Sequence, residues 1–230
     1  ELRSRCIDAL ESMDGFEVVY PEAAPDGRTL SVERGQTPTG AVANLDEGEA
    51  VAEYFRREGV DGLILCPLDF GDERSASKIA EALRVPVLLY ALAEPPVPEG
   101  PSMARTSDSY CGTLSIAAGL RRRSLPFRFA GVLSPQDESL RAEVETFARA
   151  VAVVKGLRNA RIGQVGVRPA SFESVAYDEV ALARKFGANV MYADTSEIVA
   201  VAQRIADDDP RVVEIIARLR QTVPTITVGD

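Results

Sequence analysis

The sequence predicts an α/β protein built from two doubly wound, mostly parallel sheets. Continuous apolar runs at residues 60–66 and 85–92 are typical of strands that are covered on both faces. Amphipathic segments of helical period separate the runs, and strand–helix–strand alternation at this spacing favours parallel pairing. A proline-rich stretch at residues 93–106 interrupts the alternation, which then restarts. We therefore expect two Rossmann- or flavodoxin-like domains, at residues 1–98 and 99–230.

The first predicted domain opens on a helix, whereas a doubly wound unit normally opens on a strand. Residues 1–13 carry apolar side chains near the 3.6-residue period, and Gly15 follows them as a helix-ending residue. We therefore expect this domain to lack its opening strand, which would lie upstream. The later pattern predicts a strand at 16–20, a loop at 21–44, a helix at 45–58 ended by Gly59, a strand at 60–66, a helix at 74–84 and a strand at 85–92.

The proline-rich stretch separates the two series of elements. Pro95, Pro96, Pro98 and Pro101 each lack a backbone N–H and restrict φ, which predicts an extended connector. Beyond it the pattern predicts helices at 112–123, 137–157, 177–186, 196–206 and 211–221, strands at 127–133, 161–167 and 189–192, and a strand or exit segment at 223–228.

Charge and composition narrow the range of functions. The formal net charge is −9, which disfavours a phosphate-binding surface, so we expect no nucleic-acid partner. No apolar run approaches the roughly 20 residues that span a bilayer, so we expect no membrane association. Cys6, Cys66 and Cys111 form no CxxC pair and suit a reducing cytoplasm better than a disulfide framework. Histidine is absent, which removes the usual general base and the commonest nitrogen ligand of a transition metal.

Two loops carry candidate site residues, because parallel sheets bind ligands at the carboxyl ends of their strands. The first loop places Asp69, Phe70 and Asp72 directly after the strand at 60–66. One interpretation is that Asp69 and Phe70 contact a substrate. The other is a simple turn, in which Asp72 caps the next helix and Phe70 packs back onto the core.

The second loop follows the strand at 161–167 and contains Arg168, Ser171 and Phe172. A guanidinium, hydroxyls and an aromatic ring together suit a polyol, which needs hydrogen bonds to its hydroxyls and one apolar wall. The alternative is again capping, with Ser171 or Ser174 at the start of the next helix and Arg168 paired with a neighbouring acid.

Two further motifs are weaker indications of a functional site. Gly163 and Gly166 form part of a dinucleotide fingerprint, but no third glycine opens the next helix and Pro169 interrupts the turn. Cys111 would need a general base to act as a nucleophile, and the sequence contains no histidine. We therefore favour a packing role for Cys111.

Five segments follow one another in a recognisable order: DSYCGTLSIAAGL at 108–120, FARAVAVVKGLR at 147–158, IGQVG at 162–166, FESVAYD at 172–178 and DTSEI at 194–198. In order and spacing they resemble the L-fucose and L-arabinose isomerase family, whose domain-joining helix is similar to the first segment. The resemblance extends over most of 47–205. It depends on the order of the segments, because no single one is diagnostic.

The resemblance implies that the full-length protein is a metal-dependent aldose–ketose sugar isomerase, an intramolecular oxidoreductase that works through an enediol and usually holds Mn²⁺. In that family the metal ligands are Glu, Asp and His later in the chain, so we expect this chain to bind no metal and to be inactive alone. The resemblance also implies a cytoplasmic homo-oligomer, a trimer or hexamer, that binds a small sugar or polyol. Asp69 and Phe70 match a loop that the family presents toward a neighbouring subunit's site, and Arg168 and Phe172 match a place bordering the sugar pocket.

The alternative function is a sugar-binding module of the periplasmic-binding-protein type without catalytic activity. Such proteins need two or three crossovers between their lobes. The sequence shows one clear connector, at 93–106, which favours the isomerase interpretation.

Overall fold

The structure is a computed structural model that describes residues 1–94 and 107–223. Contacts between Cα atoms divide the chain into two compact units, Glu1–Lys155 and Gly156–Asp230. Both units combine helices with parallel strands, so the predicted α/β fold class is confirmed. Within the described residues, no helix is both long enough and apolar enough to cross a bilayer.

The first unit is built on a three-stranded parallel sheet with the order β3-β4-β5. Its strands are β3 Leu63–Leu65, β4 Val87–Leu92 and β5 Arg128–Leu133. All residues of the central strand β4 are buried. Its side chains alternate between two cores, with Leu89 in one and Leu88 and Tyr90 in the other. The apolar run is therefore a strand covered on both faces, as its composition predicts.

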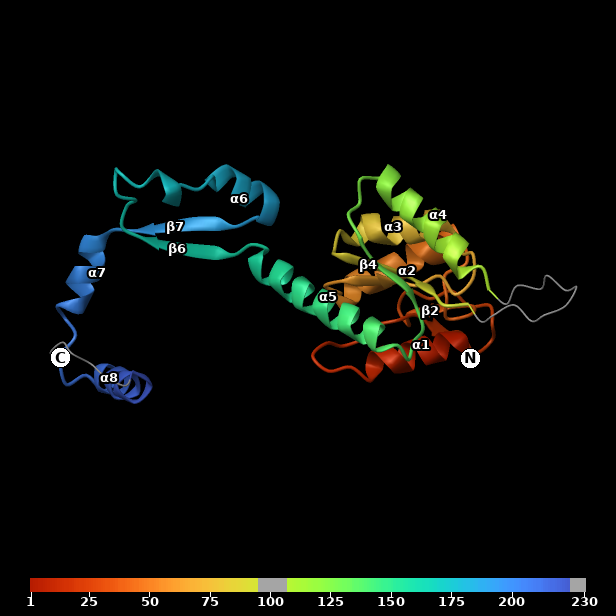
Figure 1. Cartoon of the computed structure of the whole chain (residues 1–230), viewed down its shortest axis with the longest axis horizontal. Helices are drawn as coiled ribbons and strands as arrows, with labels where there is room; N and C mark the ends of the chain where they lie inside the picture. Colours follow the sequence, from red (N-terminus) through yellow and green to blue (C-terminus); the bar gives the residue numbers. More distant parts are fainter. Residues whose placement is uncertain (95–106, 224–230) are drawn as a thin grey trace, which may run out of the picture. The chain divides into compact units, whose positions relative to one another are not determined.

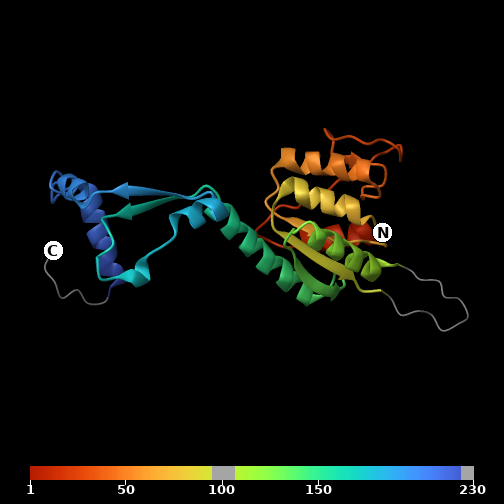
Figure 2. The ribbon, with the colours of Figure 1, turned by 90° about the horizontal axis from the view of Figure 1, so that it is seen from above.

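Helices cover both faces of this sheet (Figure 1). Phe55 of α2, Ile79 of α3 and Leu120 of α4 pack on the face that includes Leu89. Cys6 of α1 and Leu140 of α5 pack on the face that includes Tyr90. Viewed from above, α2 and α3 lie side by side (Figure 2). The helices of this unit are α1 Leu2–Glu11, α2 Leu45–Glu58, α3 Glu73–Leu83, α4 Ser109–Arg122 and α5 Glu138–Leu157.

Local side-chain chemistry determines where two of these helices begin and end. The Asn44 side chain accepts a hydrogen bond from the Glu47 N–H at 3.0 Å and so begins α2. Gly59 ends α2 with a φ of 69°, in the left-handed region that favours glycine. The Asp72 carboxylate accepts from the Arg74 N–H at 3.0 Å and begins α3. The capping roles predicted for Gly59 and Asp72 are confirmed.

The segment 16–20 is not part of a strand, although the sequence predicts one there. A β-strand needs a hydrogen-bonded neighbour, and among the described residues β3 pairs with β4 on one edge only. The predicted loop at 21–44 contains instead a short parallel pair, β1 Glu22–Ala23 with β2 Gln36–Thr37. The strand prediction at 16–20 was therefore wrong, because a partner strand is lacking in the described structure.

The second unit contains one parallel pair, β6 Arg161–Val165 with β7 Asn189–Ala193. Among its described residues only Ala188 is buried. Many of its large apolar side chains are exposed, including Val167 and Tyr192. The helical segments of this unit are η1 Glu173–Val175, α6 Glu179–Phe186, α7 Thr195–Ala202 and α8 Pro210–Thr222.

The division into units differs from the predicted boundary at 98/99. β5 lies beyond that boundary, yet it pairs with β4 from Leu88↔Arg128 to Leu92↔Leu133. Hydrogen bonding between strands, and not the composition of the intervening chain, decides which strands share a sheet. The division by contacts falls instead at Lys155/Gly156, within α5. The connector predicted at 93–106 lies outside the described residues from 95 onward, as does the exit segment from 224 onward.

Candidate functional site

The carboxyl ends of β3, β4 and β5 lie at one edge of the first unit's sheet, because the three strands are parallel. Ser109, the first residue of α4, joins two of these ends. Its hydroxyl donates to the Pro67 carbonyl at 2.6 Å and accepts from the Leu92 N–H at 2.9 Å, and both hydrogen bonds are buried. One side chain thus connects the loop after β3 to the last residue of β4.

The residues that follow β3, 67–71, form the carboxyl-edge loop. The Asp69 carboxylate binds two main-chain N–H groups. Its Oδ1 accepts from the Phe70 N–H at 2.8 Å and from the Asp108 N–H at 3.3 Å. The second of these bonds reaches the residue in front of α4. The carboxylate therefore stabilises the loop and is available at the same edge for further hydrogen bonds through its remaining lone pairs.

Gly112 of α4 lies directly against this loop. A Cβ at this position would be 2.1 Å from the Phe70 carbonyl oxygen and 2.9 Å from the Asp69 carbonyl oxygen. These are main-chain atoms, so no side-chain rotation would relieve the contact. The sequence reasoning missed this role of Gly112. An isolated glycine inside a helix pattern is the signal that indicates a close backbone approach.

Phe70 does not pack back onto the core: its side chain is 48% exposed. Tyr110, near the start of α4, is exposed to the same extent. The edge also carries Glu94, which accepts a hydrogen bond from Ser107 at 3.5 Å. Carboxylates and aromatic rings together can bind a polyol, because the carboxylates accept hydrogen bonds from hydroxyls while a ring packs against C–H groups.

The exposure of Phe70 predicts the result of its truncation. Phe70→Ala should change the free energy of unfolding by no more than about 1 kcal/mol, because about half of the residue's surface is already in water. Urea unfolding of the two proteins measures this. A loss of about 3–5 kcal/mol, the cost of removing a core phenylalanine, would contradict it.

The second predicted loop, after β6, is held by bonds within itself. Arg168 donates from a terminal guanidinium nitrogen to the Phe172 carbonyl at 2.9 Å, and the Phe172 N–H donates to the Pro169 carbonyl at 3.0 Å. Phe172 is 54% exposed, and Ser171 is exposed. Neither Ser171 nor Ser174 caps a helix through its side chain, since Phe172 occupies the N-cap of η1. Arg168, Ser171 and Phe172 thus lie in one exposed turn.

A chain of hydrogen bonds crosses the surface of the second unit. Tyr177 donates to Gln164 at 2.7 Å, the Tyr177 and Tyr192 hydroxyls lie 3.1 Å apart, and Tyr192 donates to Glu179 at 2.9 Å. The hydrogen bonds to Tyr177 and Glu179 raise the pKa of Tyr192. Sequence reasoning missed this cluster. Gln164 and Tyr192 are cross-strand partners, so only the register of β6 and β7 brings the group together.

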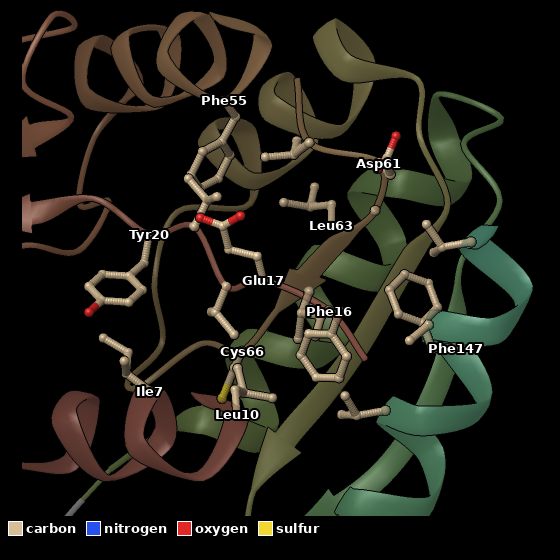
Figure 3. A pocket seen from close by; sticks show the side chains of 18 of the residues that line it. Ile7, Leu10, Phe16, Glu17, Tyr20, Phe55, Asp61, Leu63, Cys66 and Phe147 are labelled. Carbon is tan, nitrogen blue, oxygen red and sulfur yellow. The ribbon is translucent and has the colours of Figure 1, made fainter. Parts of the chain in front are cut away.

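A cavity of about 720 Å³ lies in the first unit, between the segment 16–20 and β3 (Figure 3). Its lining is mostly apolar and comes from α1, α2, α5, β3 and the segment 16–20. Cys6 and Cys66 both contribute to it and are free thiols. A hydrogen bond from the Cys66 thiol lowers the pKa of Cys6 to about 7, and the same bond together with burial raises the pKa of Cys66.

The first unit corresponds to a known family of domains. A sequence model of the family described as "Fucose/sulfoquinovose isomerase, N-terminal domain" matches residues 14–158. The chain belongs to this family. The match covers the three-stranded sheet, its helices from α2 to α5 and the carboxyl-edge loop, so that Asp69 and Phe70 lie within the N-terminal isomerase domain. Arg168, Ser171 and Phe172 lie beyond the matched residues.

Two curated relatives of the isomerase family are similar to this chain. They are the sulfoquinovose isomerases of Priestia aryabhattai and of Priestia megaterium (strain ATCC 12872 / QMB1551), each 24% identical over 160 residues. The alignment covers 70% of this chain and 35% of each relative. The chain therefore spans about a third of the length of the curated relatives it matches.

The resemblance to isomerases implies Mn²⁺, which has definite ligand requirements. Manganese prefers carboxylate, water and imidazole ligands gathered at one point. Among residues 1–94 and 107–223, no three His, Cys, Asp or Glu side chains converge on one position. The described residues of this N-terminal isomerase domain and of the second unit therefore do not fit a manganese site, and no metal ligand is assigned to them.

Proposed function

We propose that this chain is the N-terminal part of an aldose–ketose isomerase of the fucose/sulfoquinovose kind, and that it supplies contacts to the sugar but no metal ligands. The observation that supports the proposal most strongly is the family match over residues 14–158, which covers most of the first unit. The chain spans about a third of the length of its curated relatives. In this proposal the complete protein is cytoplasmic, and its proton transfer and its Mn²⁺ site are assigned to residues outside 1–230.

The carboxyl-edge loop is the proposed point of sugar contact in the first unit. Asp69 is fixed by two main-chain donors, so its carboxylate is preorganised and can accept further hydrogen bonds from sugar hydroxyls. The exposed ring of Phe70 provides an apolar wall for the C–H face of a sugar. In the assembled homo-oligomer, a trimer or hexamer, this loop is proposed to complete a neighbouring subunit's pocket.

The turn with Arg168, Ser171 and Phe172 is proposed as a second sugar contact in the complete protein. It presents a hydroxyl and an aromatic ring to solvent, and the Arg168 guanidinium keeps donors beyond the one that binds the Phe172 carbonyl. No described feature favours a stand-alone sugar-binding module over this assignment.

The proposal is tested with the full gene product, assayed for aldose-to-ketose conversion of L-fucose and of sulfoquinovose with added Mn²⁺. We expect conversion of one of these sugars and its loss after chelation. Asp69→Asn should raise KM about tenfold with a smaller effect on kcat, since one charged hydrogen bond contributes roughly 1.5–3 kcal/mol. The purified Glu1–Asp230 chain should show no conversion under the same conditions.

Asp61→Asn is the matched control for Asp69→Asn. Asp61 lies before the amino end of β3, at the opposite end of the strand, where it forms an ion pair with Lys155 at 2.7 Å. This variant should leave KM unchanged. Equal KM values for the Asp69 and Asp61 variants, or turnover by the Glu1–Asp230 chain alone that a chelator abolishes, would contradict the proposal.

A further inference from the structure

Two cysteines from distant parts of the sequence meet in the first unit. Cys6 lies on α1, and Cys66 directly follows β3, 60 positions later. Both pack in the core of Leu88 and Tyr90, and both line the cavity. A hydrogen bond joins the two thiols. The Cys66 side chain points toward α1 (Figure 3). The tertiary structure therefore places two free sulfurs in contact.

The surroundings of the two sulfurs make the pair unequal. The hydrogen bond from Cys66 lowers the pKa of Cys6 to about 7, and the Tyr90 hydroxyl and the charge of Arg5 act in the same direction. The same thiol–thiol bond and burial raise the pKa of Cys66. Burial also raises the pKa of Tyr90, so its hydroxyl keeps its proton and can donate to a thiolate. Near neutral pH a large share of Cys6 is therefore thiolate, while Cys66 keeps its proton.

A thiolate next to a thiol is the arrangement that peroxides oxidise to a disulfide. The thiolate is the nucleophile that attacks a peroxide, and the sulfenic acid that results condenses with a second thiol within reach. The cavity that both sulfurs line has a volume of about 720 Å³. Hydrogen peroxide is only a little larger than a water molecule, whose share of liquid volume is about 30 Å³. The cavity therefore has room for the oxidant beside both sulfurs.

We propose that Cys6 and Cys66 are a peroxide-sensitive pair, in which a hydroperoxide converts the two thiols to a disulfide between α1 and the end of β3. The Cys6 thiolate attacks one peroxide oxygen, the O–O bond breaks, and Cys6 becomes a sulfenic acid while the leaving oxygen takes up a proton. The Cys66 sulfur then attacks the Cys6 sulfur. An S–S bond forms, the S–O bond breaks, and the Cys66 proton leaves with the hydroxide as water. Two electrons pass from the thiols to the peroxide.

The disulfide connects α1 to the loop after β3. Cys66 directly precedes Pro67, whose carbonyl accepts from the Ser109 hydroxyl at 2.6 Å and is thereby already joined to α4. The crosslink closes a long stretch of chain, which lowers the entropy of the unfolded state more than a short loop does. Oxidation should therefore raise the urea midpoint of unfolding by about 1 M, and dithiothreitol should reverse the rise.

The test uses the Glu1–Asp230 chain with Cys111→Ser, in which Cys6 and Cys66 are the remaining cysteines. The reduced protein is exposed at micromolar concentration to hydrogen peroxide, alkylated with iodoacetamide and digested without reductant. We expect the peptides that contain Cys6 and Cys66 to be joined, with a mass two hydrogens below their sum, and to separate after treatment with dithiothreitol. The intact protein should lose both alkylation sites together.

Two single substitutions separate the roles of the thiols. In Cys66→Ser, oxidation of Cys6 should stop at the sulfenic acid, which dimedone labels, because the second thiol is absent. In Cys6→Ser, oxidation should be slower by at least about tenfold, because burial still raises the pKa of Cys66 and little thiolate is present. Neither variant should show the rise in urea midpoint that dithiothreitol reverses.

The pH dependence of the oxidation rate provides a second measurement. The rate should rise with pH up to about 7 and level off above it, because it follows the thiolate fraction of Cys6. The groups that act on this ionisation are Cys66, Tyr90 and Arg5. Arg5→Gln should move the midpoint of the profile to higher pH, since the positive charge that stabilises the thiolate is then absent.

Three results would overturn the proposal. The first is consumption of the thiols by peroxide without a peptide that joins Cys6 to Cys66. The second is an equal oxidation rate in Cys6→Ser and Cys66→Ser, since the two sulfurs would then react independently. The third is a disulfide found only between two chains in non-reducing electrophoresis, since the sulfurs of one chain would then not be in contact.

Discussion

Gly112→Ala should lower the free energy of unfolding by about 3 kcal/mol, at the upper end of the range for overpacked positions. The added Cβ would lie 2.1 Å from the Phe70 carbonyl oxygen and 2.7 Å from its carbonyl carbon. Either α4 or the carboxyl-edge loop must move away. The better helix propensity of alanine, about 1 kcal/mol, offsets only part of this cost. Urea unfolding at constant pH measures the loss.

Gly156→Ala is the matched control for this substitution. Gly156 is also a glycine within a helix, α5, but a Cβ there would meet no atom within 4 Å. Because alanine meets no clash here and has a higher helix propensity than glycine, the free energy of unfolding should rise by roughly 0.5–1 kcal/mol. Equal effects of the two substitutions would mean that α4 does not touch the loop backbone. In the full gene product, Gly112→Ala should also raise KM for the sugar, because the displaced loop carries Asp69 and Phe70.

Leu140→Ala should lower the free energy of unfolding by about 3 kcal/mol, within the range of roughly 2–5 kcal/mol for truncation of fully buried leucines. Leu140 has no exposed surface and packs against the core that contains Leu88 and Tyr90. It attaches the first half of α5 to the face of the sheet. This contact joins residues on both sides of the predicted 98/99 boundary. The free energy of opening measured by native-state hydrogen exchange at the Leu88 and Tyr90 amides should therefore fall by the same amount as the free energy of global unfolding.

Val153→Ala, further along α5, is the control for Leu140→Ala. Val153 is 61% exposed, so its truncation should change the free energy of unfolding by no more than about 0.5 kcal/mol. If Leu140→Ala left the exchange of the β4 amides unchanged, α5 would not belong to the same cooperative unit as the sheet, and the boundary near residue 98 would be favoured instead.

Several features of this protein could be predicted from the sequence because their causes are local. The apolar run of β4 indicates a strand buried on both faces without knowledge of its neighbours. Gly59 ends α2 and Asp72 begins α3 through bonds to main-chain atoms only a few residues away. The same holds for the order of helices and strands, from which both the α/β class and the resemblance to the isomerase family follow.

Other features were decided by contacts between residues far apart in the chain. β5 joins the sheet of β3 and β4 because its main chain pairs with β4, which the proline-rich composition between them could not reveal. Phe70 is exposed, and its main chain lies directly against α4 at Gly112, a contact between residues 42 positions apart that the sequence pattern does not indicate. The segment 16–20 has the side-chain pattern of a strand but no hydrogen-bonded partner among the described residues. A sequence pattern specifies which faces of an element are apolar. Whether that element becomes part of a sheet depends on a neighbour with free N–H and C=O groups, and only the tertiary structure shows where such a neighbour lies.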